Sequence, residues 1–228
     1  MPSISKSGDY SITRSTIFVC IFPLISCTIV PDDKDKESEG KGEKIYIYFE
    51  NENFKPDEYV ESVWEEKVVP LFKEKSVPIG DIIPTWRRDQ EAAGEKFGYR
   101  EKAEGSPWNF RVKGSGIVVA ANTKSRASTI DIDLLPGDGN ADLCMQIGPV
   151  FKDSSIRDSL DFVSFTDFTN QLEFGRLSNA FNKVVHQDVV SKLDRDKLIG
   201  TKITFLGAFT QLQNSDLIRV TPVFLEVE

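Results

Sequence analysis

The order of strand-like and helix-like patterns between residues 106 and 228 constrains the fold more than any other feature of the sequence. Apolar and polar residues alternate in five segments, which predict strands at 108–119, 129–134, 143–147, 201–207 and 217–227. A helical pattern at 167–193 separates the third strand from the fourth. Gly114 and Gly116 in the first strand indicate a bulge or a strong bend. Pro222 cannot donate a ladder hydrogen bond, so the last strand should lie at an edge or contain a break.

This order of three strands, a helix and two strands, with a long and bent first strand, is that of an OB-type Greek-key barrel. We therefore predict an α+β fold with an OB-like five-stranded barrel (β-β-β-α-β-β) at 106–228, in which the helix is an insertion. A generic α+β sandwich has the same order of elements and is the alternative.

A mainly helical region at 45–105 is predicted to precede the barrel as an N-terminal cap. Pro56 suits a first helical position. An apolar stripe with helical spacing follows at Val60, Val63, Trp64, Val68 and Leu71. Pro70 should kink or end this helix, and a second helix is expected at 85–97.

A short apolar run at 16–25 follows an N-terminal stretch that carries Lys6 and Arg14. A helix that crosses hydrocarbon needs about 20 apolar residues, and charged residues begin shortly after this run. The pattern therefore predicts a signal peptide at 1–26 rather than a transmembrane helix.

The apolar run ends in Leu24-Ile25-Ser26-Cys27, which has the pattern of a lipobox. The small Ser26 allows a peptidase to approach the bond, and the thiol of Cys27 can take a diacylglyceryl group as a thioether. We therefore predict a lipoprotein-type signal peptide with Leu24, Ile25 and Ser26 as recognition residues and Cys27 as the lipidated residue. The charged segment 27–44 is expected to be the lipidated N-terminus and a flexible tether. An ordinary secretory signal with a chance cysteine and a buried helix are the alternatives.

Charge and cysteine content limit the possible classes of protein. The chain has a net charge of −8, and residues 1–26 contribute +1, so the remainder carries −9. Nucleic-acid binding needs a basic footprint, which this composition does not supply. No disulfide is expected, because Cys20 leaves with the signal peptide and Cys27 is lipidated. Cys144 then has no partner and is expected in the core.

The sequence contains no motif of a catalytic, metal or cofactor site, so we predict a protein that is not an enzyme and that needs no cofactor. The acidic residues around Asp138 resemble a calcium loop, but an EF-hand would need Gly at Leu143 and Glu at Pro149. A hairpin turn with solvated acids is expected instead. His186 falls opposite the apolar stripe of its predicted helix, which places it at the surface.

The most distinctive segments are SPWNFRVKGSG (106–116), TKSRAS (123–128), MQIGPVF (145–151), SFTDFTNQLEF (164–174) and the C-terminal GAFT and VTPVFLEV. Together they resemble a family of predicted periplasmic lipoproteins of unknown function, domain of unknown function 2291, over roughly residues 54–228 and at the lipidated cysteine. The resemblance implies a periplasmic location. Such proteins tend to be encoded beside sugar-type ABC transporters, which implies an accessory role in solute uptake. The resemblance implies no catalytic activity.

The OB-type fold itself points to two loops, because ligands of these barrels bind near the loops that join strands 1 to 2 and 4 to 5. Here these loops contain Asn122, Lys124, Arg126, Gln211, Gln213 and Asn214. We regard Lys124 and Arg126 as candidate ligand contacts, with solvated loops as the alternative.

Five other residues are candidate ligand contacts. Trp108 and Asn109, at the entry to the barrel, are candidates for a platform on which a sugar stacks, with a core position as the alternative. Arg157, Asn170 and Gln171 are polar residues among Phe and Leu. They are either ligand contacts or buried hydrogen-bonding partners that fix the structure.

These observations predict a lipid-anchored periplasmic binding or accessory module, without catalytic activity, that is associated with a sugar-type ABC transporter. Its expected partners are components of the transporter, a small solute and the membrane, which it contacts through the lipid on Cys27. No nucleic-acid partner is expected. The alternatives are an envelope hydrolase that uses carboxylates and a structural or assembly lipoprotein of the cell envelope. Thr28 occupies the position where Asp would indicate retention in the inner membrane, so the outer membrane is favoured where there is one.

Overall fold

A computed structural model describes residues 54–101, 105–212 and 215–228 of the chain. The chain divides into two units, Met1–Tyr46 and Ile47–Glu228, and all described residues lie in the second unit. The predicted signal peptide, the lipobox with its cysteine, and the tether lie outside the described residues.

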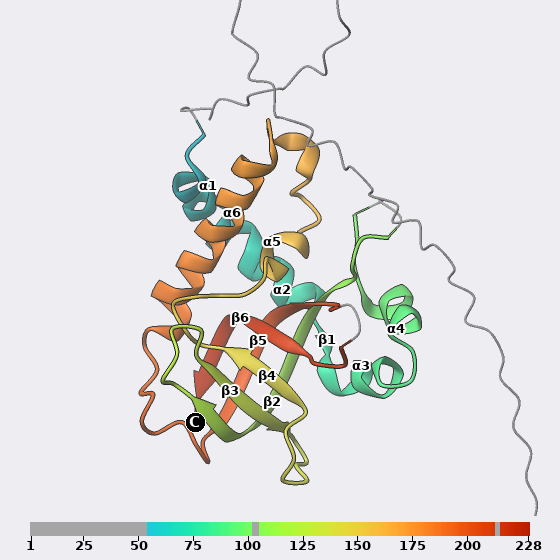
Figure 1. Cartoon of the computed structure of the whole chain (residues 1–228), viewed down its shortest axis with the longest axis vertical. Coiled ribbons are helices and arrows are strands. Elements are labelled where there is room, and N and C mark those ends of the chain that lie inside the picture. Colours follow the sequence, from blue (N-terminus) through green and yellow to red (C-terminus); the bar gives the residue numbers. More distant parts are fainter. Residues whose placement is uncertain (1–53, 102–104, 213–214) are drawn as a thin grey trace, which may run out of the picture. The chain divides into compact units, whose positions relative to one another are not determined.

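Five strands form a closed barrel. They are β2 (Asn109–Asn122), β3 (Thr129–Leu134), β4 (Leu143–Gln146), β5 (Lys202–Thr210) and β6 (Arg219–Val227). Their order is β2-β3-β4-β6-β5, and β5 pairs again with β2, which closes the sheet (Figure 1). β4 and β6 run parallel, and the other four pairs are antiparallel. The predicted OB-type barrel is confirmed, and the alternative of a generic α+β sandwich is excluded because the pairing of β5 with β2 closes the sheet.

The long strand β2 bends so that it serves two neighbours. Residues 109–117 pair with β5, and residues 116–122 pair with β3. Gly116 belongs to both ladders, and a Cβ atom at this position would lie 2.4 Å from the carbonyl oxygen of Asp133. Only glycine permits this close approach of two backbones. A bulge is also present, but it lies between Val118 and Ala120, beyond the two glycines that predicted a bulge or bend.

Pro222 lies in β6 opposite Gly207 of β5. β6 is not an edge strand, because it has β5 on one side and β4 on the other. Of the two predicted alternatives the break is correct, since the β5–β6 register shifts between Leu206 and Gly207, beside the proline.

The first helix of the cap begins at the predicted residue, Pro56. Helix α1 (Pro56–Val63) continues through a π-helical segment, η1 (Trp64–Val68), into α2 (Val69–Lys75). All five residues of the predicted apolar stripe are buried. The helical path does not end at Pro70, because this proline lies in the first turn of α2, directly after the change from π- to α-helical hydrogen bonding, where a missing N–H is tolerated.

The predicted second helix, 85–97, corresponds mainly to α4 (Gln90–Phe97), and a separate helix, α3 (Ile79–Trp86), precedes it. They are separate because the side chain of Asp89 accepts hydrogen bonds from the backbone N–H groups of Glu91 and Ala92, both at 3.0 Å, and so starts a new helix. A two-residue strand, β1 (Val77–Pro78), precedes α3 and pairs in parallel with β2.

The predicted inserted helix, 167–193, is shorter than predicted, and shorter helical segments lie before and after it. Helix α5 (Ser155–Asp158) and a 3₁₀ turn, η2 (Phe165–Asp167), come before α6 (Gln171–Val184), and a π-helical segment, η3 (Val185–Val190), extends α6. Asn170 caps α6 through hydrogen bonds from the N–H groups of Leu172 and Glu173. α6 lies beside α1 (Figure 1) and η3 packs against β6. In the described part of the chain, no helix combines the length and apolar composition that a bilayer crossing requires.

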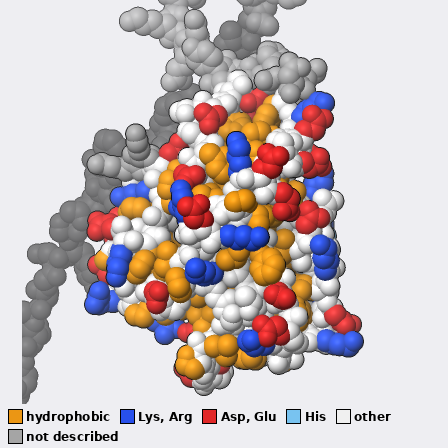
Figure 2. Space-filling model, turned by 180° about the vertical axis from the view of Figure 1, so that it is seen from behind, with side chains coloured by type: hydrophobic (Ala, Val, Ile, Leu, Met, Phe, Trp, Pro, Cys, Tyr) orange, Lys and Arg blue, Asp and Glu red, His pale blue; other side chains and the backbone are white. Residues whose placement is uncertain are grey.

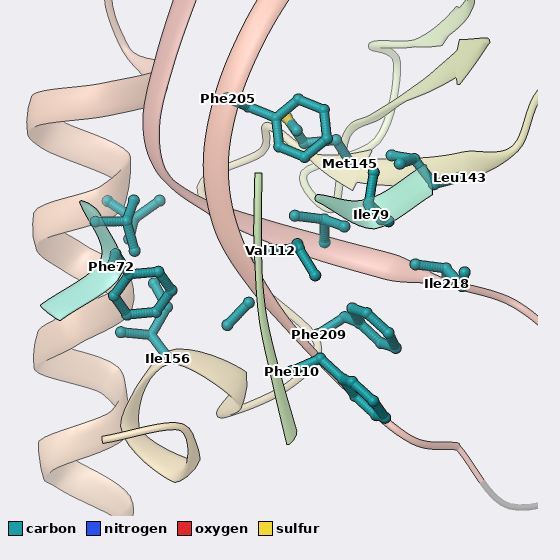
Figure 3. Packing of buried hydrophobic residues seen from close by; sticks show 14 of the residues in the cluster. Phe72, Ile79, Phe110, Val112, Leu143, Met145, Ile156, Phe205, Phe209 and Ile218 are labelled. Atoms are coloured by element: carbon teal, nitrogen blue, oxygen red, sulfur yellow. The ribbon is translucent and has the colours of Figure 1, made fainter. Parts of the chain in front are cut away.

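One apolar core joins the cap to the barrel. Figure 3 shows side chains from the helices and the strands in this cluster. Within this core the rings of Phe110 and Phe209 stack at 4.5 Å between centroids, and Trp86 of α3 meets both rings edge-on at 5.5 and 5.3 Å. Since Trp86 belongs to the cap and the two phenylalanines to β2 and β5, the cap and the barrel stabilise each other.

Candidate solute-binding groove on α6

A groove of about 650 Å³ follows the outward face of α6. Its helical wall consists of residues three or four positions apart, which share one face of a helix. They include Gln171, Gly175, Asn179 and Asn182. The opposite wall is the segment 151–154, and Arg157 lies at one end. We call this hollow the α6 groove.

A buried polar network holds the wall opposite α6 in place. The carboxylate of Asp153 accepts hydrogen bonds from Gln146 Nε2 at 2.8 Å, Thr221 Oγ1 at 3.0 Å and Ser155 Oγ at 2.7 Å. Gln146 and Thr221 are buried residues of β4 and β6. Asn182 of α6 donates to the carbonyl oxygen of Asp153 at 3.0 Å. The wall is therefore fixed both to the barrel and to α6.

Arg157 separates the α6 groove from a smaller hollow of about 210 Å³, because it lines both. Its side chain is 11% exposed and donates to Asp158 Oδ1 at 2.6 Å and to the carbonyl oxygen of Phe174 at 2.7 Å. Its guanidinium also lies 3.6 Å from the centroid of the Phe174 ring. These contacts hold the Arg157 side chain in place between the two hollows.

The smaller hollow contains Tyr99, Asn109 and Asp158. Burial raises the pKa of the Tyr99 phenol, and the nearby carboxylates of Glu101 and Asp161 raise it further. The phenol therefore stays protonated at neutral pH and can donate a hydrogen bond.

Three polar side chains of the α6 groove, those of Lys152, Gln171 and Asn179, have no hydrogen bond or ion pair with a described residue. They offer an ammonium group and two amides, which donate and accept hydrogen bonds. Phe151 and the exposed Leu172 add apolar surface. Amides, a cation and an apolar surface around one hollow suit a small polar solute.

The structure brings some of the predicted contacts together. Arg157 and Gln171 line the α6 groove, and Asn109 lines the smaller hollow beside Arg157. Asn170 is buried as the cap of α6 and lines neither hollow. Asn109 is also buried, and its side-chain oxygen accepts a hydrogen bond from Thr210 at 2.7 Å.

Trp108 packs against the cap. A Cβ atom on Gly94 of α4 would lie 2.2 Å from its ring, and the guanidinium of Arg100 lies 4.0 Å from the ring centroid. These neighbours occupy the space that a stacked sugar would need, so the structure favours the core interpretation of Trp108.

Among the described residues of the two loops that the OB-type fold singles out, none lines the α6 groove. Lys124 and Arg126 are exposed, and the carbonyl oxygen of Arg126 accepts a hydrogen bond from the N–H of Val150 at 3.1 Å. In the loop between β5 and β6, Asp216 accepts hydrogen bonds from Trp86 and Gln90 of the cap. The predicted candidates Gln213 and Asn214 lie outside the described residues.

The acidic hairpin forms as predicted, but one of its acids is not solvated. Asp133 is 5% exposed, and its carboxylate accepts hydrogen bonds from the N–H groups of Asp138 and Gly139 at 3.2 and 2.7 Å. These bonds close the turn, which explains the burial. Within the described ranges no group of three or more His, Cys, Asp or Glu side chains is placed to hold a metal ion.

Cys144 lies on the outward side of β4 and is half-buried, so the expectation that it belongs to the core is wrong. Alternation along β4 explains this position, because its neighbours Leu143 and Met145 are the residues that point inward. Burial raises the pKa of the Cys144 thiol, which disfavours the reactive thiolate.

Sequence reasoning missed Lys152, Asn179 and Asn182 as residues of the groove. The spacing of Gln171, Asn179 and Asn182 on one helical face was a usable signal. No sequence pattern indicated Lys152, because its place depends on how the segment 151–154 lies against α6.

The fold defines an OB-fold protein with an α-helical cap. The sequence matches the family model described as predicted periplasmic lipoprotein (DUF2291) over residues 17–226, and the chain belongs to this family. The family description gives it as a predicted periplasmic lipoprotein, which supports a location in the periplasm. Its structure is similar to the crystal structure of an OB-fold protein from Thermotoga maritima, with a TM-score of 0.63 and 18% sequence identity over 77% of this chain and 99% of that chain. No curated protein matches the sequence.

Proposed function

We propose that this protein is a lipid-anchored module that binds a small polar solute in the α6 groove and carries out no catalysis, as an accessory of a sugar-type ABC transporter. The observation that carries the proposal is the set of unpartnered groups in the groove, those of Lys152, Gln171 and Asn179. Unpaired amides and a cation beside apolar surface are typical of solute recognition. Asp153, the carboxylate in the lining, is engaged in the buried network, which favours a structural role for it over acid–base chemistry.

The binding proposal predicts that an Asn179→Ala variant loses affinity for its solute by about tenfold, because one or two hydrogen bonds to the ligand disappear. The experiment uses the full chain in a mild non-ionic detergent and titrates ribose, xylose, glucose and glucuronate by isothermal calorimetry. Gln187→Ala is the matched control, since Gln187 is exposed near the end of the same helical stretch and does not line the groove. Binding that Asn179→Ala leaves unchanged would exclude the groove as the site. If none of the four sugars bound, the proposal that the ligand is a sugar would be contradicted.

The anchoring proposal rests on Cys27, which lies within the matched family region. We expect cells fed a labelled fatty acid to label the wild-type protein and Cys20→Ala, and not Cys27→Ala, because only the Cys27 thiol would carry the lipid. Equal labelling of Cys27→Ala and the wild type would end this assignment. Thr28 supports the outer membrane as the site of the anchor where a cell has one. Crosslinking in intact cells tests the accessory role, and it should capture a transporter subunit.

A further inference from the structure

A separate hollow of about 430 Å³ lies on the outer face of the barrel and shares no lining residue with the α6 groove. Its floor follows one row of the ladder, in which Lys113 of β2 is opposite Leu206 of β5, and Leu206 is opposite Phe224 of β6. Lys73 at the end of α2 and Pro78 of β1 form its side. We call it the barrel-face hollow.

The floor of the barrel-face hollow is apolar and uncovered. Phe224 is 40% exposed, whereas the nearby Phe205 of β5 is 1% exposed. Leu206 beside it is half-buried, and Pro78 is exposed. In the view of Figure 2, charged side chains of both signs interrupt the hydrophobic patches of the surface. The charges at the barrel-face hollow, in contrast, have one sign.

Two lysines and no acidic residue line this hollow. Both Lys73 and Lys113 are exposed, and neither makes an ion pair or a side-chain hydrogen bond with a described residue. Glu226, the next outward residue of β6 after Phe224, does not line the hollow. In a chain with a net charge of −8, two unpaired cations beside an apolar floor form a local site for negative charge.

We propose that the barrel-face hollow binds an anionic amphiphile. A carboxylate or phosphate group lies between the ammonium groups of Lys73 and Lys113, and the apolar part of the ligand covers Leu206 and Phe224. Lysine is a common ligand for such anions, and its aliphatic stem extends the apolar surface. The volume falls within the range of small-molecule sites, about 300–1,000 Å³. A free fatty acid and an anionic lipid of a bilayer share this chemistry.

The test uses the full chain synthesised without membranes, so that no lipid is attached and no detergent competes. Isothermal calorimetry measures the affinity for decanoate below its micelle concentration, with decanol as the uncharged ligand of equal length. We expect decanoate to bind about tenfold more tightly than decanol, because the two ammonium groups contact its carboxylate. The Lys73→Gln/Lys113→Gln variant should remove this difference, and Phe224→Ser should weaken both ligands.

The matched control is Lys124→Gln/Lys192→Gln, which removes two exposed lysines that do not line the hollow and so lowers the net charge equally. Its affinity for decanoate should equal that of the wild type. Equal affinities of the wild type for decanoate and decanol would overturn the proposal, and so would equal losses in the two double variants. Thermal unfolding of each variant shows whether it is folded.

Vesicle flotation then distinguishes the two sources of the amphiphile. If the ligand is a membrane lipid, the wild type floats with phosphatidylglycerol vesicles and not with phosphatidylcholine vesicles, and Lys73→Gln/Lys113→Gln abolishes flotation. Decanoate binding without flotation identifies a free amphiphile.

Discussion

Replacing Trp86 with alanine is expected to lower the free energy of unfolding by about 3–5 kcal/mol, the usual cost of truncating a buried aromatic residue to alanine. Trp86 is 1% exposed and meets Phe110 and Phe209 edge-on, so the variant opens a cavity where α3 joins β2 and β5. Urea unfolding followed by far-UV circular dichroism measures the change without depending on tryptophan fluorescence.

Trp86→Phe is the control for this prediction. It keeps an aromatic ring but removes the Nε1–H group that donates to the carbonyl oxygen of Asp216 at 3.2 Å. We expect a smaller loss of about 1–2 kcal/mol. If Trp86→Ala cost no more than Trp86→Phe, ring packing would not be what joins the cap to the barrel.

Replacing Asp153 with alanine is expected to lower the free energy of unfolding by about 2–4 kcal/mol, because it removes the acceptor from buried donors. Gln146 is 2% exposed and Thr221 is fully buried, and both donate to this carboxylate. The unpaired donors remain away from water, where each costs about 1–3 kcal/mol. Urea unfolding measures the loss.

Two further variants are the controls for Asp153→Ala. Asp153→Asn retains one acceptor oxygen and should lose less stability than the alanine variant. Asp188→Ala removes an exposed carboxylate of η3 and should change stability by no more than about 0.5 kcal/mol. A loss at Asp153→Ala as small as that at Asp188→Ala would contradict the network described for the groove wall.

The barrel could be predicted because its strands alternate cleanly. The pattern at 129–134 gives the same bounds as β3, since Ile130 and Ile132 alternate with polar residues and are both fully buried. Gly116 and Pro222 indicate the bend in β2 and the register shift in β6 by their residue types alone. In each case a local chemical restriction, the missing side chain of glycine or the missing N–H of proline, has a local structural consequence.

The elements that sequence reasoning missed are short and depend on tertiary contacts. The strand β1 has two residues, which is too few for any periodicity, and it exists because Val77 pairs with Val112 of β2. The boundary between α3 and α4 depends on the side chain of Asp89, which lies within the single helical pattern predicted at 85–97. Apolar spacing does not detect such a cap.

The candidate groove was only partly predictable for a similar reason. Arg157 and Gln171 stood out as polar residues in an apolar stretch, and they line the groove. Lys152 lies in a segment without regular structure, and the network around Asp153 brings it to α6. This network joins residues far apart in the sequence, such as Asp153 and Thr221, so no local window contains it.

The pairing of β2 with β5 also determines when the molecule can finish folding during export. The side chains of Asn109 and Thr210, at one end of this ladder, are 101 positions apart in the chain. Contacts between such distant positions form slowly, because a long loop must close first. The barrel therefore cannot close until nearly the whole polypeptide has emerged on the far side of the membrane. Until then the edge of β2 that pairs with β5 is unpaired, and this is the stage at which a chaperone would protect the chain from aggregation.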